Sequence, residues 1–315
     1  MYFFDQLEPG ENREGYQKLL ADFGNLIRDS IRFTWNAWGS TQSASYAEQK
    51  HYPLTVMVLT RHICEQLGGV EALVIQGCAE PCKPLLRSSF EAVLGIQYVL
   101  ESDSENRGMA YQVAHAHRQI SFYRKLDPTE ESGKQLVAAL KNDPLASGFK
   151  WTANTKPMVA NLQEMLARPE FLPIEAEWQR MTGTGKKKRK TNWFALFGGP
   201  SDVEQLAKRF NHAGMYEFLY RHWSNAVHAG DCLRCIARGN GFNRGEIAIK
   251  PIQHPEGLQS MVVWSAAVCH LVARALRGRW ATQSENEIAE GDWNSRVQPR
   301  LNEMYGRELI VAKWN

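Results

Sequence analysis

The sequence lacks long apolar runs and a strong excess of either charge. No stretch approaches the roughly 18 apolar residues that a membrane-spanning helix requires. The first ten residues contain acidic side chains and no basic region, so they do not predict a secretory signal peptide. Lysine and arginine number 37 against 34 aspartate and glutamate, and this formal charge of +3 is too small to indicate nucleic-acid binding by itself. We therefore expect a soluble cytoplasmic protein without membrane association.

Cysteine is also scarce, and its spacing does not suggest a disulfide framework. The 315 residues contain six cysteines, of which Cys78 and Cys82 lie four positions apart while Cys232 and Cys235 form one CxxC pair. A structural zinc site usually needs two such pairs or a pair of histidines at short spacing. These four thiols would bind zinc only if the fold brought them together. We expect instead reduced thiols that pack as small apolar groups, and no metal or other cofactor.

A βαβ alternation is absent, so a doubly wound nucleotide-binding fold is not expected, and no internal repeat occurs. Apolar residues recur instead at helical spacing along most of the chain. Residues 83–100 are apolar on most sides, which is typical of a central helix. Pro53 begins the preceding helix, and Gly68-Gly69 predicts a break or a kink in it. We predict an all-α helical bundle.

Three regions are expected along the chain. An N-terminal helical segment comprises residues 1–50, a helical core domain comprises residues 51–281, and a C-terminal tail comprises residues 282–315. The core contains an irregular, glycine-rich insertion at about residues 182–201. Residues 246–250 alternate in polarity, which predicts a short strand or an extended loop.

The insertion carries a run of five basic side chains. They are Lys186, Lys187, Lys188, Arg189 and Lys190. Such a run usually forms a solvated loop. The alternative is contact with RNA phosphates, with Trp193 and Phe194 close by for base stacking. The letters GTGK in this loop lack the spacing of a phosphate-binding loop and the strand that precedes one, so they do not indicate that motif.

The most informative polar pattern lies in residues 220–230, YRHWSNAVHAG. Arg221 and His228 are seven positions apart, which at about 100° per residue is about 20° short of two full helical turns. A continuous α-helix therefore places both on one stripe, with Ser224 and Asn225 between them. A polar stripe on an otherwise apolar helix needs hydrogen-bond partners or a solvent-filled cleft.

A second polar pair lies on the predicted central helix. Arg87 and Glu91 are four positions apart, so their side chains share one face. On an apolar helix such a pair must form an ion pair or line a pocket. The first interpretation is a structural, buried ion pair. In the second, Glu91 orients a histidine on a neighbouring helix, namely His228.

An arginine and a histidine suit the cleavage of RNA without a metal. A neutral histidine accepts the proton of a 2′-hydroxyl, for which its ordinary pKa of about 6.5 is suitable. An arginine holds the phosphate oxygens and stabilises the charge of the transition state. The 2′-hydroxyl then attacks the adjacent phosphate, and the product carries a 2′,3′-cyclic phosphate.

Arg221 and His222 followed by His228 resemble the R-x4-6-H motif of HEPN-type helical ribonucleases. The resemblance implies an HEPN-like helical fold in which Arg221 and His228 are the catalytic residues. It also implies a homodimer in which the motifs of two chains converge. Proteins of this type commonly act as toxins or in antiphage defence. The chain would then be an effector that stays inactive until triggered, alone or with a partner protein in a larger defence complex.

The wider pattern resembles a bacterial family of unknown function over roughly residues 60–280. Three features carry this resemblance: an R-S-x-x-E helix, a later tryptophan, and a Y-x-x-x-S-x-x-x-H helix. The residues are Arg87, Ser88 and Glu91, then Trp151, then Tyr220, Ser224 and His228. This resemblance implies an all-helical fold and brings no activity with it.

The sequence therefore favours a metal-independent RNA endonuclease with Arg221 and His228 as catalytic residues. The supporting residues are Ser224, Asn225, Glu91, Arg87 and His222. Two alternatives stay open. One is a structural polar cluster in a helical sensor or scaffold that binds a ligand or a partner protein, and the other is a nucleotide site without cleavage. A structural role is the favoured interpretation for six histidines. His115 and His117 lie two apart on a helix and face different sides, while His212, His222, His254 and His270 have no ligand-like neighbours at useful spacing.

Overall fold

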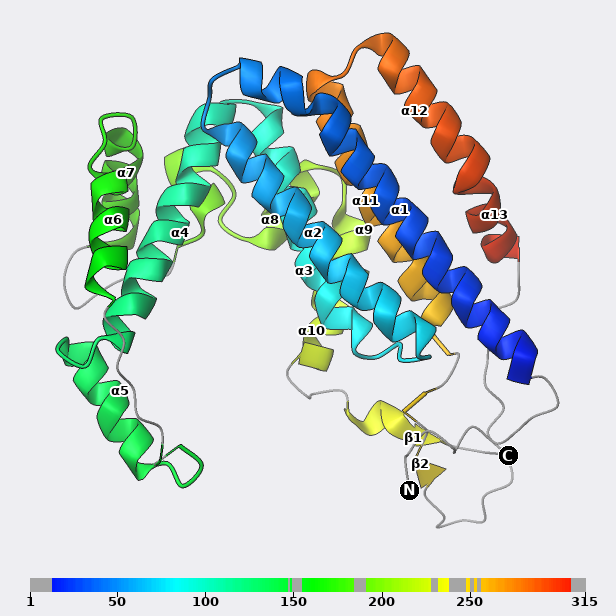
Figure 1. Ribbon diagram of the computed structural model, residues 1–315, viewed down its shortest axis with the longest axis horizontal. Helices are drawn as coiled ribbons and strands as arrows, with labels where there is room; N and C mark the ends of the chain where they lie inside the picture. Colours follow the sequence, from blue (N-terminus) through cyan, green and yellow to red (C-terminus); the bar gives the residue numbers. More distant parts are fainter. Residues whose placement is uncertain are drawn as a thin grey trace. The chain divides into compact units, whose positions relative to one another are not determined.

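The computed structural model describes residues 13–146, 148, 155–183, 191–227, 232–237, 248–249, 252–253 and 256–306. Within these residues the chain is all-α, as predicted, apart from two strands of two residues each. The chain divides into two compact units. Unit 1 comprises Met1–Glu101 and Val203–Asn315, and unit 2 comprises Ser102–Asp202 (Figure 1).

Four long helices form the body of unit 1. They are α1 (Arg13–Ala47), α2 (Tyr52–Ile75), α3 (Cys82–Glu101) and α11 (Leu258–Trp280). α1 packs against α2, α2 against α3, α3 against α11 and α11 against α1, so the four helices close a ring of contacts (Figure 1). Each helix turns its apolar face toward the others, which removes those side chains from water.

α3 is the central helix that the sequence predicts at residues 83–100. Leu86, Phe90, Val93 and Leu94 on it are completely buried. Burial of such a side chain stabilises the fold by about 1.5–3 kcal/mol. The position of α3 is therefore fixed by its apolar residues, and its polar residues are presented by a rigid element.

α2 differs from the sequence prediction at its glycine pair. Pro53 stands in the first turn, as expected, but the helix continues through Gly68 and Gly69 to Ile75. A Cβ atom at Gly69 would lie 3.0 Å from Leu85 Cδ1. The missing side chain thus lets α3 approach α2 closely. This packing outweighs the cost of about 1 kcal/mol that a glycine imposes on a helix.

After unit 2 in the sequence, several shorter elements of unit 1 pack against α3. α8 (Val203–Arg209), the π-helix η3 (Tyr216–His222) and α10 (Trp223–Val227) all pack against α3. The one-turn helix α9 (Ala213–Met215) stands between α8 and η3. The 3₁₀-helix η4 (Cys232–Cys235) follows α10 in the sequence.

A two-stranded antiparallel pair follows η4. β1 (Ile236–Ala237) pairs with β2 (Ala248–Ile249), with Ile236 opposite Ile249. β2 lies within residues 246–250, where the sequence predicts a short strand or an extended loop.

The last two helices of unit 1 are α12 (Gln283–Arg296) and α13 (Gln298–Gly306). Thr282 begins α12 with a capping box, in which its hydroxyl accepts a hydrogen bond from the Glu285 backbone while the Glu285 carboxylate accepts one from the Thr282 backbone. Such reciprocal bonds satisfy backbone groups that the first helical turn leaves unpaired.

Trp293 of α12 joins the core of unit 1. Its ring lies 4.8 Å from the Phe33 ring on α1 and 4.6 Å from the His270 ring on α11, measured between centroids. The segments that the sequence assigns to an N-terminal region and to a tail thus pack together in one unit.

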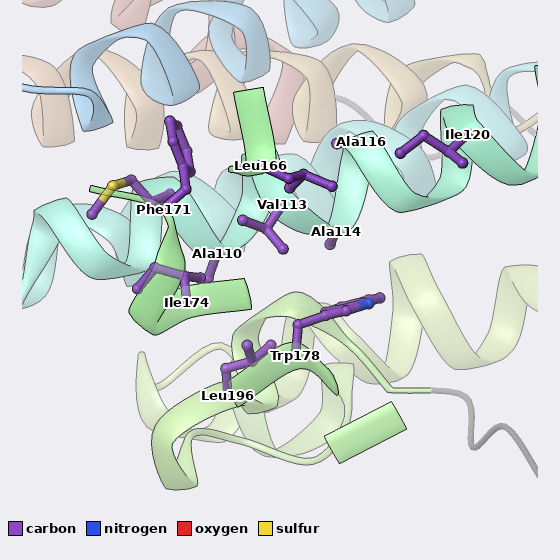
Figure 2. Packing of buried hydrophobic residues seen from close by; sticks show 11 residues of the cluster. Ala110, Val113, Ala114, Ala116, Ile120, Leu166, Phe171, Ile174, Trp178 and Leu196 are labelled. Carbon is purple, nitrogen blue, oxygen red and sulfur yellow. The ribbon is translucent and has the colours of Figure 1, made fainter. Parts of the chain in front are cut away.

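Unit 2 packs around α4 (Ser104–Leu126). α4 contacts α5 (Glu131–Asn142), α6 (Lys156–Leu166), α7 (Leu172–Thr182) and the 3₁₀-helix η2 (Trp193–Gly198). Figure 2 shows apolar side chains of α4 beside those of α6, α7 and η2 and beside Phe171, which precedes α7. Its labelled residues are Ala110, Val113, Ala114, Ala116, Ile120, Leu166, Phe171, Ile174, Trp178 and Leu196. The predicted insertion at residues 182–201 therefore contributes Leu196 of η2 to this core.

α11 is the one helix in the described part of the chain that is long and apolar enough to cross a membrane. Half of its apolar stretch is buried inside this protein. The core helix of a soluble protein passes the same test of length and composition, and the packing of α11 against α1 and α3 accounts for its apolar character.

Two glycines of α1 provide a matched test of its packing against α2. A Cβ atom at Gly24 would lie 2.5 Å from Ile75 Cγ1, whereas a Cβ atom at Gly39 would meet nothing within 4 Å. We expect Gly24→Ala to lower the free energy of unfolding by about 1–2 kcal/mol through overpacking. Gly39→Ala should raise it by up to about 1 kcal/mol through helix propensity. Urea unfolding followed by circular dichroism measures both, and equal effects would contradict the close approach at Gly24.

Candidate functional site

The two polar patterns of the sequence meet where η3 packs against α3. The guanidinium carbon of Arg87 lies 4.1 Å from the centroid of the Tyr220 ring. The Tyr220 ring stacks on Tyr216 at 5.2 Å with an interplanar angle of 18°. The guanidinium carbon of Arg221 lies 5.4 Å from the Tyr216 centroid. These four side chains form one series of contacts, which we call the arginine–tyrosine cluster.

The π-helical backbone of η3 produces this arrangement. In a π-helix the hydrogen bonds join residues five apart, so each turn is wider and holds more residues than in an α-helix. Tyr216 therefore lies close to both Tyr220 and Arg221, which follow it by four and five positions. Short π-helical insertions occur frequently at functional sites. The spacing of Tyr216 and Tyr220 was visible in the sequence, but nothing in it indicated a π-helix.

The π-helical backbone of η3 also contradicts the geometry that was assumed for the predicted polar stripe. The alignment of Arg221 with His228 assumed about 100° per residue over a continuous α-helix. Arg221 instead belongs to the π-helix η3, and the short α-helix α10 ends at Val227. The wider π turn rotates the following residues about the helix axis, so the assumed angle does not apply. His228 lies outside the described residues.

Arg87 is half-buried and keeps an unsatisfied donor. Its Nε atom is buried and has no hydrogen-bond partner within the described residues. Leaving a buried donor unpaired costs about 1–3 kcal/mol, whereas a cation–π contact contributes about 0.5–2 kcal/mol. The contact with Tyr220 thus offsets only part of that cost. A water, carboxylate or phosphate oxygen at this position would satisfy the donor.

Glu91 stands one helical turn after Arg87 and is exposed to water. Neighbouring protein atoms remove some of its hydration, and this burial raises the pKa of the carboxyl, while the charge of Arg87 offsets part of the rise. No hydrogen bond or salt bridge joins the two within the described residues. The buried ion pair that the sequence favours is not formed, because the guanidinium lies over Tyr220. An accessible carboxyl with a raised pKa is suited to proton transfer.

Arg221 is exposed but already paired with two carboxylates. Its Nη2 atom lies 2.7 Å from Glu204 Oε2 on α8, and its Nη1 atom lies 3.0 Å from Glu217 Oε1 on η3. The charges of Glu217 and Glu204 raise the pKa of the guanidinium. Glu204 also accepts a hydrogen bond from Lys208 at 2.7 Å. The sequence missed Glu204, because it lies 17 positions from Arg221 and no local pattern connects them.

The other predicted supporting residues lie beside this pair. His222 and Asn225 are exposed, and Ser224 is partly buried. The Arg234 Nη2 atom lies 2.9 Å from His222 Nε2. Arginine has no acceptor atom, so in this hydrogen bond it donates and the imidazole nitrogen accepts. His222 is thereby tied to η4.

Ser88 of the R-S-x-x-E pattern takes no part in the arginine–tyrosine cluster. Its Oγ atom lies 2.8 Å from His62 Nε2 on α2, a contact that joins α3 to α2. His212, near the start of α9, contacts Gln97 of α3 at 3.1 Å, and burial lowers its pKa. Both histidines therefore bind the surrounding elements to α3.

Several predicted residues lie outside the described residues. They are His228, Trp151, His254 and the basic run Lys186, Lys187, Lys188, Arg189 and Lys190. The residues that flank the basic run are described: Trp193 stands at 5.4 Å from Tyr111 and Phe194 is buried, both in unit 2. Phe194 is thus a core residue rather than a platform for a base.

Unit 2 contains a histidine–carboxylate pair that the sequence did not indicate. His117 Nε2 lies 2.7 Å from Glu175 Oε2, and the imidazole stacks on Trp178 at 5.5 Å. Burial raises the pKa of Glu175, but hydrogen bonds from His117 and Gln179 outweigh it, so the net pKa is lowered. The pair joins α4 to α7. Groups of three or more metal-ligating side chains are not found in the described part of the chain.

The contact between Arg87 and Tyr220 can be measured by a double-mutant cycle. We expect Tyr220→Leu to lower the free energy of unfolding by about 1–2 kcal/mol, while Tyr220→Phe, which keeps the ring, should change it little. After Arg87→Met, the cost of Tyr220→Leu should fall by about 0.5–1 kcal/mol, because the partner is gone. Identical costs of Tyr220→Leu in both backgrounds would contradict the contact.

The raised pKa of Glu91 predicts a pH-dependent stability. Ionising this carboxyl costs more in the folded state, so the penalty develops as the pH rises from the unfolded value of about 4.3 through the raised folded value. We expect Glu91→Gln to raise the melting temperature at pH 7 and the gain to vanish at acidic pH, where both states keep the proton. Glu164→Gln, at an exposed glutamate of α6, controls for the lost charge. A loss of stability at pH 7 would refute the raised pKa.

Comparison with known proteins places the chain in a family. A family model, described as a family of unknown function (DUF5677), matches residues 54–238, which is more than half of the chain. Neither the curated proteins nor the solved structures contain a significant match. The match includes α3 and η3, the two elements that carry the arginine–tyrosine cluster. The predicted relation to an uncharacterised family is confirmed in this sense: the chain belongs to the family of unknown function DUF5677.

Proposed function

We propose that this protein is a metal-independent RNA endonuclease of HEPN type. The observation that carries the proposal is the exposure of Arg221, His222 and Asn225 together on the segment formed by η3 and α10. The arginine–tyrosine cluster anchors this segment to the central helix α3. An exposed arginine on a rigid support is suited to binding a phosphodiester.

The carboxylates around Arg221 do not prevent such binding. The Arg221 side chain is 55% exposed, and Glu204 and Glu217 are 31% and 51% exposed. Ion pairs at exposed positions contribute only about 0.2–1 kcal/mol. A phosphate that accepts two parallel hydrogen bonds from a guanidinium interacts more strongly than a single exposed contact. Exchange of a carboxylate for an RNA phosphate is therefore energetically accessible.

In the proposed reaction, His228 accepts the proton of a 2′-hydroxyl. The 2′-oxygen forms a bond to the adjacent phosphorus, the bond from phosphorus to the 5′-oxygen breaks, and a general acid protonates that oxygen. Arg221 stabilises the negative charge on the phosphate oxygens. The products carry a 2′,3′-cyclic phosphate and a 5′-hydroxyl. In a homodimer, the second copy of the motif would supply the general acid.

The remaining predicted residues have supporting roles in this proposal. Glu91 lies on the helix that carries Arg87, and its raised pKa suits an exchange of protons with the catalytic histidine. Asn225 and His222 hold the substrate, and the basic run at residues 186–190 contacts the RNA backbone. The biological setting, a cytoplasmic toxin or antiphage effector that acts alone or within a larger complex, follows from the HEPN resemblance.

A second candidate is a non-catalytic helical sensor or scaffold. The observation that favours it is that both tyrosine rings contact arginines and each other, while Arg221 already has two carboxylate partners. In that case these polar residues stabilise the packing of η3 on α3, and the chain binds a ligand or a partner protein elsewhere.

RNA cleavage in the presence of EDTA separates the two candidates. We expect the purified full chain to cleave single-stranded RNA, and Arg221→Ala and His228→Ala each to lower the rate by about 100-fold or more, the usual loss when a transition-state contact is removed. Arg296→Ala provides a matched control, because Arg296 is also exposed and paired with a carboxylate, that of Asp292 at 2.7 Å. This control should cleave at the wild-type rate.

Melting temperatures complete the test. Loss of cleavage with an unchanged melting temperature supports the nuclease. An inactive wild-type chain, with a melting temperature that falls sharply in Arg221→Ala, would overturn the nuclease and favour the scaffold. Activity that survives both substitutions would assign cleavage to other residues or to a contaminant.

A further inference from the structure

The CxxC pair of η4 has a different environment from the other cysteines. Cys232 and Cys235 are free thiols on the surface of unit 1, while Cys82 and Cys269 are buried. The expectation that the cysteines pack as small apolar groups is therefore wrong for Cys232 and Cys235. Leu233 and Arg234 between the pair are also exposed. Nothing in the candidate RNA site uses either thiol, so their exposure calls for a separate explanation.

Their local backbone places the two thiols on one side of a single turn. In a 3₁₀-helix, residues three apart are eclipsed, and with a rise of about 2.0 Å per residue their Cα atoms lie about 6 Å apart. Disulfides join Cα atoms that are usually about 4.4–6.8 Å apart. Cys232 and Cys235 are the first and last residues of η4. Closing the bond requires only that this short turn tighten until the Cβ atoms approach to about 3.8 Å.

The four other thiols are protected from the same chemistry. Burial raises the pKa of Cys64 to about 11 and that of Cys82 to about 12. Burial also raises the pKa of Cys78 and of Cys269. The thiolate is the reacting form, so thiols with a raised pKa and little access to solvent react slowly with disulfides.

We propose that Cys232 and Cys235 form a reversible dithiol–disulfide site that reacts with small disulfides. One thiolate attacks a sulfur of the small disulfide, which forms a mixed disulfide and releases one thiolate. The second cysteine thiolate attacks the protein-bound sulfur, which forms the Cys232–Cys235 bond and releases the second thiolate. Two protein thiols are oxidised, one small disulfide is reduced to two thiols, and the two protons pass to solvent or to the released thiolates.

The site is connected to the candidate RNA site through Arg234. This residue lies between the two cysteines and donates a hydrogen bond to His222 Nε2 at 2.9 Å. Tightening the turn displaces Arg234 relative to η3, so oxidation loosens the contact with His222. The inference does not depend on RNA cleavage, because the thiol chemistry and the His222 contact are both measured directly.

Oxidation of the full chain by glutathione disulfide tests the proposal. After reduction and removal of reductant, the chain is incubated with glutathione disulfide, quenched by alkylation and analysed by peptide mass spectrometry. We expect a Cys232–Cys235 disulfide within one chain, reversed by dithiothreitol, to form at least about tenfold faster than oxidation of the other thiols. Cys232→Ser and Cys235→Ser should each stop at a glutathione adduct on the remaining cysteine. Cys78→Ser should close like the wild type.

Other outcomes would overturn the proposal. These are glutathione adducts that persist on both cysteines of the wild type, a disulfide between chains, or a Cys78–Cys82 bond that forms equally fast. The connection to His222 has its own measurement. Oxidation should shift the NMR signals of the His222 ring in the wild type but not in Cys235→Ser, and unchanged signals in the wild type would refute that connection.

Discussion

The contact of the Arg87 guanidinium with the Tyr220 ring is the interaction on which the candidate site depends. Arg87 stands on α3, whose position is fixed by buried residues such as Phe90. η3 contains a single fully covered residue, Leu219. The cation–π contact therefore supplements the burial of one leucine in holding η3 against α3. The exposed side chains of η3, including that of Arg221, are positioned by this attachment.

The two arginines of the site differ in how strongly their surroundings hold them. Arg87 is half-buried, contacts an aromatic ring and keeps a donor without a partner among the described residues, whereas Arg221 is exposed and paired with Glu204 and Glu217. Exposed pairs exchange partners at low cost, and buried groups do not. The inner arginine is thus suited to hold the segment in place, and the outer one to meet a phosphate. The proposed dithiol pair Cys232–Cys235 would act on this segment through Arg234 and His222.

The spacing of apolar residues along the sequence was sufficient to predict much of the fold. The apolar spacing of residues 83–100 indicated a central helix, and α3 buries Leu86, Phe90, Val93 and Leu94. The prediction of a break at Gly68-Gly69 was wrong, because the fit of Leu85 against Gly69 is a contact between two helices. The α-helical geometry assumed for the polar stripe through Arg221 was wrong for a related reason. Its arithmetic assumed an α-helix, whereas η3 is a π-helix in contact with α3.

The sequence by itself determined the helical class, the central place of α3 and the presence of one CxxC pair, whereas the exposure of that pair came only from the structure. These properties depend on the spacing of residues within a few turns, because the regular geometry of a helix determines which residues share a face. Tertiary structure alone decided the partners: Tyr220 for Arg87, Glu204 for Arg221, and Glu175 for His117. The members of these pairs are separated by 133, 17 and 58 positions, respectively. Contacts at such separations arise from the packing of whole helices, and the spacing of residues within a few turns does not indicate them.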